Sequence, residues 1–129
     1  MPGKFNTYVK NNSNDKHPTR FYSKKQENAV AEAVGGKTTA NSGATMFGGK
    51  GDVVTSGSES FLIECKTKTT PSDSISIKKS WFLKNKQEAI STGKAHTALV
   101  FNFGPDEENH YVIDEYLFKE LLEHLKENN

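Results

Sequence analysis

Residues 51–68 read Gly-Asp-Val-Val-Thr-Ser-Gly-Ser-Glu-Ser-Phe-Leu-Ile-Glu-Cys-Lys-Thr-Lys, and this stretch decides the fold. Two runs rich in β-branched and apolar residues flank a short Ser/Gly segment, a pattern that predicts two strands joined as a hairpin. Because side chains alternate across a strand, Glu64 and Lys66 share one face of the second strand. The register of such a hairpin brings Asp52, Glu64 and Lys66 together.

Two carboxylates and a lysine at one place suit metal-dependent phosphodiester hydrolysis. Asp52 and Glu64 supply oxygen ligands for Mg²⁺, which keeps several waters and so needs few protein ligands. Lys66 is placed to orient a water or to stabilise negative charge on a phosphate. Each residue also has an ordinary interpretation, with Asp52 as a turn residue and Glu64 and Lys66 as an ion pair on a wet face. Their joint occurrence in an apolar β-run favours the site.

A helix before the hairpin carries a further acid. A capping box beginning at Ser23 predicts a helix that runs to about Val34 and is ended by the two glycines that follow. Glu27 lies on the same stripe as Val30, in line with residues expected to be buried. An acid in that position either serves a site or lies at the solvated end of the stripe.

The segment between this helix and Asp52 is a glycine-rich loop, residues 41–51. It does not match a P-loop, because Gly51 follows Lys50 where a Ser or Thr should bind magnesium. We expect it to let the backbone approach a ligand, with Ser42 as a candidate contact to phosphate or as a plain loop residue.

A second helix is expected from about Ser80 to Thr92, ended by Gly93. On its stripe with Leu83 and Ile90, Gln87 should face inward and position a water or Lys66, unless it is a surface amide.

Two further strands and a closing helix complete the predicted fold. The strands are expected at 96–103 and 111–113, and Asp114 should cap the helix. The helix is expected to turn an apolar face inward, consisting of Leu117, Phe118, Leu121, Leu122 and Leu125. The strand 96–103 and this helix belong either to the core or to a dimer interface. The order α-β-β-β-α-β-β-α predicts an α/β fold with a mixed sheet flanked by helices.

The charge distribution and the composition indicate which partner and which cellular compartment to expect. The net charge of +1 hides 15 Lys/Arg against 8 Asp/Glu in residues 1–104, and 2 against 8 in residues 105–129. A basic body suits a phosphate-bearing partner. Residues 1–20 form a candidate flexible basic arm before a single domain at 21–129. The absence of a long apolar run predicts no membrane segment, and the single cysteine offers no disulfide, so a cytoplasmic protein is expected.

With Gly51-Asp52, then Glu64-Cys65-Lys66, and a preceding helix bearing Glu27, the chain resembles the PD-(D/E)XK nuclease superfamily. Gly51 stands where that family's name-giving proline would be. The likeness covers roughly residues 21–104 and implies a restriction-endonuclease-like core, α-β-β-β-α-β, here followed by a β-α unit. Size and layout are most similar to Holliday junction resolvases of the archaeal and phage type.

The resemblance implies a role for each matching residue. Asp52, Glu64 and the backbone carbonyl of Cys65 would bind Mg²⁺, with Mn²⁺ as a substitute. Lys66 would be the catalytic lysine and Glu27 an accessory acid that reaches the metal through water, with Gln87 on the helix that follows. Candidate contacts to the DNA are Ser42, Lys50, Lys68, Lys79 and Lys84.

The expected function is that of a metal-dependent endodeoxyribonuclease that cuts branched DNA as a homodimer, in a bacterial or phage-infected cell. DNA recognition should depend on backbone shape and charge, since Arg20 is the only arginine in the chain. Two alternatives stay open. One is a restriction-like or repair nuclease acting on duplex or flap DNA, and the other is a non-catalytic nucleic-acid-binding module with a nuclease-like fold.

Overall fold

The computed structural model describes residues 19–39 and 52–128. The elements follow the predicted order, α-β-β-β-α-β-β-α. They are α2 Thr19–Val34, β2 Lys37–Thr38, β3 Val53–Val54, β4 Phe61–Lys66, α3 Lys79–Thr92, β5 His96–Phe101, β6 His110–Val112 and α4 Glu115–Glu127. The predictions made for residues 1–18, Ser42 and Lys50 fall outside the described residues.

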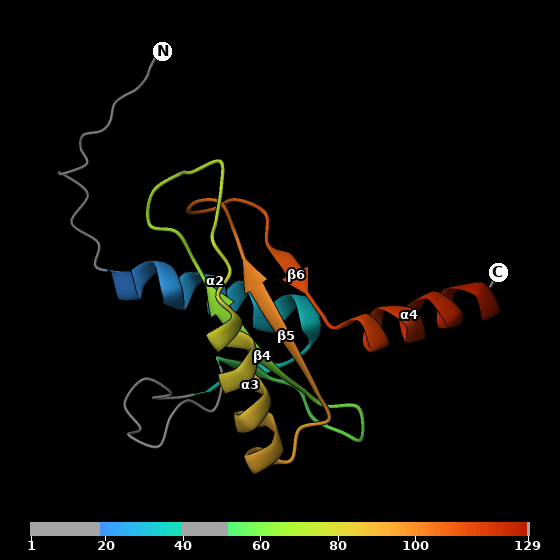
Figure 1. Ribbon diagram of the computed structural model, residues 1–129. Coiled ribbons are helices and arrows are strands. Elements are labelled where there is room, and N and C mark those ends of the chain that lie inside the picture. The colour runs from blue at the N-terminus through green and yellow to red at the C-terminus, as the bar shows by residue number, and fades with distance from the viewer. Residues whose placement is uncertain (1–18, 40–51, 129) are drawn as a thin grey trace.

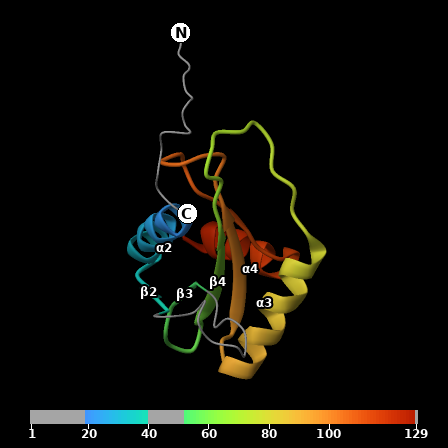
Figure 2. The ribbon, with the colours of Figure 1, turned by 90° about the vertical axis from the view of Figure 1, so that its left-hand side faces the viewer.

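The strands form one five-stranded mixed sheet in the order β2-β3-β4-β5-β6. Strands β4 and β5 are parallel, and the other neighbouring pairs are antiparallel. A parallel pair needs a crossover connection, which α3 provides here. Figure 2 shows α2 and α3 on opposite sides of the central strands. The mixed sheet flanked by helices that the sequence predicts is thus confirmed.

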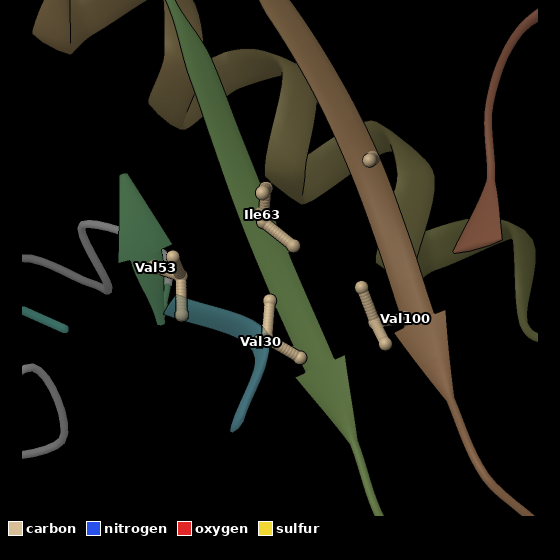
Figure 3. Close-up of a cluster of buried hydrophobic side chains, with 5 residues drawn as sticks. Val30, Val53, Ile63 and Val100 are labelled. Atoms are coloured by element: carbon tan, nitrogen blue, oxygen red, sulfur yellow. The ribbon is translucent and has the colours of Figure 1, made fainter. Parts of the chain in front are cut away.

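One face of the sheet packs against α2 and forms the main core (Figure 3). Val30 of α2 is fully buried against Val53, Ile63 and Val100, with Ala98 beside them. The register pairs Val53 with Ile63 and Ile63 with Ala98, so all the strand residues of this cluster point to the same face. The alternation of β4 therefore leaves Leu62, Glu64 and Lys66 for the opposite face.

That opposite face packs against α3. Leu62 and Leu99 are buried there, and the helix turns Asn85 and Ala89 towards them. The Asn85 side-chain amide donates hydrogen bonds to the backbone carbonyls of Leu62 and Ala98, at 3.4 and 3.2 Å. These bonds offset the cost of burying the amide and fix the rotation of α3 about its own axis.

The inward stripe predicted for α3 was wrong. Leu83 and Ile90 are 53% and 80% exposed, and Gln87 is exposed between them. Successive helical residues advance by about 100°, so Gln87 lies about 200° from the buried Asn85. The helix thus turns its polar Asn85 inward and two large apolar residues outward.

Helix α2 begins earlier than predicted. It starts at Thr19, so the last two residues assigned to the basic arm are helical and Ser23 lies inside the helix instead of capping it. Tyr22 lies in the added turn and is buried against the rest of the protein, which explains the extension. A tertiary contact of this kind stabilises a first turn that local sequence does not predict.

The predicted helix ends are confirmed. Gly35 follows α2 with φ +70°, and Gly93 caps α3 with φ +74°, the left-handed conformation that glycine adopts without strain. Gly36 has a different requirement, since a Cβ there would lie 2.5 Å from the carbonyl oxygen of Val54. Glycine at this position lets α2 turn directly into the edge strand of the sheet.

Helix α4 does not bury the apolar face predicted for it. It extends away from the sheet after β6 (Figure 1), and among its described residues Leu117 is the buried one. Asp114 precedes the helix as predicted, but its carboxylate contacts Lys86. The remaining apolar residues of the predicted inner face are 40–60% exposed, namely Phe118, Leu121, Leu122 and Leu125. No helix among the described residues has the length and apolar character needed to cross a membrane.

Candidate active site

The predicted hairpin register is present, and it brings Asp52 beside β4. Val53 pairs with Ile63, and the backbone N–H of Asp52 donates to the carbonyl of Ile63 at 2.9 Å. The backbone N–H of Cys65 donates in turn to the Asp52 carboxylate, Oδ2, at 2.8 Å. A side-chain acceptor thus continues the ladder at the end of β3 and fixes the Asp52 carboxylate against the strand that carries Glu64.

Lys66 is held in place by two partners. Its ammonium lies 3.1 Å from Glu64 Oε2, and it stands over the ring of Trp81, 4.5 Å from the ring centroid. The side chains of Lys66 and Glu64 are 29% and 22% exposed, so the pair is partly shielded and still reachable from solvent. Trp81 comes from the first turn of α3, which thereby aims the lysine that β4 supplies.

Glu27 of α2 contributes a third negative charge to this region. It is half-buried, and burial is the largest cause of a pKa above the ordinary glutamate value. Lys24 and Arg20 oppose this rise, and the charge of Glu64 adds to it. Glu27 therefore lies within electrostatic range of Glu64, on the buried side of the helix as the sequence predicts.

The electrostatics of the site are dominated by crowded carboxylates. Burial, the largest cause, and the neighbouring charge of Glu64 together raise the pKa of Asp52 to about 7, although the N–H of Cys65 acts in the opposite direction. Lys66 also lowers the Asp52 pKa, but among the charges its effect is smaller than that of either glutamate. A bound cation would relieve this repulsion, and perturbed carboxylates of this kind are typical of functional sites.

Cys65 contributes its backbone to the site and its side chain to the core. The side chain packs against the cluster under α2, and burial together with the nearby acids raises the pKa of its thiol. The thiol is therefore a neutral packing group rather than a nucleophile. In a strand the N–H and C=O of one residue point to the same side, so the Cys65 carbonyl lies on the edge where its N–H meets Asp52.

The donor set fits a hard divalent cation with few protein ligands. Asp52, Glu64 and the Cys65 carbonyl provide oxygen atoms on one side of β4. Among residues 19–39 and 52–128, no group of three His, Cys, Asp or Glu side chains gathers closely enough to hold a metal by itself. This matches Mg²⁺, which usually binds through one or two carboxylates and completes its coordination with water and substrate phosphate.

The other predicted site residues do not all lie beside Asp52 and Glu64. Gln87 points away from the sheet, so the structure does not bring it to Asp52 and Glu64. Lys79 and Lys84 are exposed on α3, where Lys84 lies 3.8 Å from Glu88. Lys68 follows β4 and is partly buried.

Two residues at the site were not predicted from the sequence. Trp81 lies under the Lys66 ammonium. Gln26 fixes the end of β4 through the Lys66 carbonyl and also donates to Asn109 Oδ1 at 3.1 Å. The sequence carries no spacing signal for either contact, because each joins segments that are distant along the chain.

Comparison of the chain with protein-family models, with curated proteins and with solved structures gives no match.

Proposed function

We propose that this protein is a Mg²⁺-dependent endodeoxyribonuclease with a restriction-endonuclease-like core, and that it cuts branched DNA of the four-way junction type. The observation that carries the proposal is the convergence of Asp52, Glu64 and Lys66 at the carboxyl end of the central strand β4. The strand order and the two flanking helices are compatible with such a core.

Each residue has a defined task in phosphodiester hydrolysis. A water adds to phosphorus, one P–O ester bond breaks, and the proton of the water ends on the leaving oxygen. The metal, when bound, supplies positive charge to the phosphate oxygens. Asp52 and Glu64 would hold it, with the Cys65 carbonyl as the third protein ligand. Asp52 is already oriented for this task by the N–H of Cys65.

Lys66 acts on the reacting phosphate and water. Glu64 and Trp81 restrict its ammonium to a small region, so little ordering remains to be done when DNA binds. Its positive charge favours the extra negative charge that develops on the phosphate, and its N–H groups can orient the attacking water. Glu27 stands farther out and would act through a water.

Binding of the DNA is expected to depend on the phosphate backbone. Lysines predominate in residues 1–104, and Lys79 and Lys84 are exposed. Lysine contacts to phosphates supply affinity that falls steeply with salt and carries little sequence information. A substrate defined by its shape, such as a junction, suits this kind of recognition, and DNA in the cytoplasm of a bacterial or phage-infected cell would provide it.

A substrate panel tests the proposal. End-labelled four-way junction, linear duplex, flap and single-stranded DNA are incubated with the full chain in Mg²⁺ and in EDTA. Paired symmetric nicks on the junction, present only with Mg²⁺, are the expected result. Cutting of linear duplex or flap instead would retain the nuclease site and refute the junction assignment. Binding without cutting in Mg²⁺ or Mn²⁺ would refute the enzyme and favour a non-catalytic DNA-binding module.

A further inference from the structure

Helix α4 has an apolar face for which the described part of the chain provides no cover. Phe118, Leu121, Leu122 and Leu125 occupy positions three or four residues apart and are 40–60% exposed. Beyond its first turn, the helix packs on no other helix or strand within residues 19–39 and 52–128. Exposed apolar patches of several large side chains mark interaction surfaces.

The base of α4 is nevertheless fixed in position. The Tyr116 hydroxyl is hydrogen-bonded to Nδ1 of His96 at 2.9 Å, and Nε2 of His96 lies 2.7 Å from Glu59. Leu117 is buried, and Asp114 contacts Lys86. The first turn is thus anchored to the sheet, and the following turns project from it (Figure 1). A helix of 13 residues is marginal in water without tertiary packing, so the projecting turns need a partner.

The excess of acidic residues on α4 argues against DNA or an anionic membrane as its partner. From Asp114 to Glu127 the chain carries five acids, Asp114, Glu115, Glu120, Glu123 and Glu127, against Lys119 and Lys126. An acidic helix is repelled by DNA phosphates and by anionic lipid headgroups. The partner must therefore offer an apolar protein surface.

The pattern of apolar residues on α4 is complementary to itself. Phe118 and Leu125 lie at equal distances from the midpoint between Leu121 and Leu122. When two such helices pack antiparallel about a two-fold axis through that midpoint, Phe118 of one copy meets Leu125 of the other, and Leu121 meets Leu122. An isologous interface requires this symmetry, since one patch must fit itself.

The charges beside the apolar face support the same arrangement. Glu115 and Lys126 lie on the same flank of the stripe, near opposite ends of the helix. In the antiparallel pair, Glu115 of one copy comes within about half a helical turn of Lys126 of the other, twice by symmetry. Each helix also places an acid in its first turn and bases in its last turn. The antiparallel pairing sets these opposite ends beside each other.

We propose that α4 is the dimerisation element of this protein and binds α4 of a second copy in antiparallel orientation. The inference deepens the proposed function, because a four-way junction presents two symmetric strands and needs two active sites. The dimer would hold the two sites at a fixed separation through the anchored base of α4. Its test does not depend on cleavage.

Sedimentation of the full chain without DNA tests the interface. Wild type should be a dimer, and Leu122→Glu should raise the dimer dissociation constant by at least about 30-fold, the size of a hot-spot loss. Ile90→Glu is the matched control, since Ile90 is 80% exposed on α3 and should leave the dimer intact. A monomeric wild type, or a Leu122→Glu variant that remains fully dimeric, would overturn the proposal.

A charge exchange tests the antiparallel geometry. Glu115→Lys should weaken the dimer by about fivefold or more, and the double variant Glu115→Lys with Lys126→Glu should restore it. Failure of the double variant to recover would refute the antiparallel pairing. Circular dichroism on each variant separates dissociation from unfolding. A monomeric Leu122→Glu that still nicks DNA with Mg²⁺ would support both proposals, whereas a dimeric wild type that cuts no DNA would refute the function alone.

Discussion

The crowded carboxylates predict that the candidate active site lowers the stability of the fold, and Asp52→Asn measures that cost. Asparagine retains an oxygen that accepts the hydrogen bond of the Cys65 N–H, and it removes a negative charge that burial and Glu64 disfavour. Because the substitution preserves the size of the side chain, a change in stability can be assigned to the charge. We therefore expect Asp52→Asn to be more stable than wild type wherever Asp52 is ionised.

The magnitude follows from the Asp52 pKa, which is about 7 in the folded protein against an ordinary value of 3.8. Folding therefore favours the protonated form, and the associated stability is complete below pH 3.8 and is lost as pH rises through 7. A difference of about three pKa units corresponds to about 4 kcal/mol in total. Between about pH 5 and pH 8 the Asp52 carboxyl group ionises in the folded protein, which removes the stabilisation that corresponds to roughly two of those pKa units. Wild type should therefore lose about 3 kcal/mol of unfolding free energy that Asp52→Asn keeps.

Urea denaturation of both proteins at about pH 5 and pH 8, without divalent cations, provides the measurement. Asp73→Asn is the matched control, since Asp73 is exposed and should leave the pH dependence unchanged. Mg²⁺ at pH 8 should stabilise wild type and not Asp52→Asn, because a ligand of the native state stabilises it by mass action. Parallel stability curves for wild type and Asp52→Asn would refute the electrostatic argument.

Further predictions concern the lysine, the core and the basic segment. Lys66→Met should reduce cleavage at least about 100-fold, while metal binding, measured by calorimetry, persists. Lys119→Met on α4 is the control. Near-normal cleavage by Lys66→Met would show that Lys66 has no catalytic role. In denaturant titrations, Leu62→Ala in β4 should cost about 3 kcal/mol of unfolding free energy, and Leu83→Ala in α3 less than about 0.5 kcal/mol. An equal cost for Leu83→Ala would show that Leu83 is buried and that the orientation assigned to α3 is wrong. Deletion of residues 2–18 should weaken DNA binding and reduce the salt slope of log K by up to about 3; an unchanged slope would exclude phosphate contacts by its three lysines.

The sequence predicted best what short-range rules determine. Alternation along β4 placed Glu64 and Lys66 on one face, and a two-strand register was enough to set Asp52 beside them. The left-handed residues Gly35 and Gly93 ended the helices where glycine was expected. These features depend on local geometry, which residues near one another in the sequence specify.

The predictions failed where contacts between distant parts of the chain determine which face of a helix is buried. In α3 the prediction relied on the spacing of Leu83 and Ile90, which are exposed, whereas the buried residues are Asn85 and Ala89. Asn85 is acceptable inside because two backbone carbonyls of the sheet accept its hydrogen bonds. In α4 the apolar periodicity was evident, but within the described residues its face is exposed apart from Leu117.

The interaction of Lys66 with Trp81 shows a third limit. Both residues are visible in the sequence, but their contact depends on where α3 begins relative to β4. A tryptophan in a first helical turn gives no sign of a lysine on a strand that ended 15 residues earlier. Contacts of this kind determine how well the lysine is oriented, which neither motif nor spacing conveys.

The most direct test of the central claim is single-turnover cleavage of a labelled four-way junction by wild type, Asp52→Asn and Asp73→Asn over a range of Mg²⁺ concentrations. If Asp52 holds the metal, wild type and Asp73→Asn will cut with the same saturable Mg²⁺ dependence, and Asp52→Asn will bind the junction without cutting it. Cleavage by Asp52→Asn at the wild-type rate, or wild-type cleavage that continues in EDTA, would contradict the account.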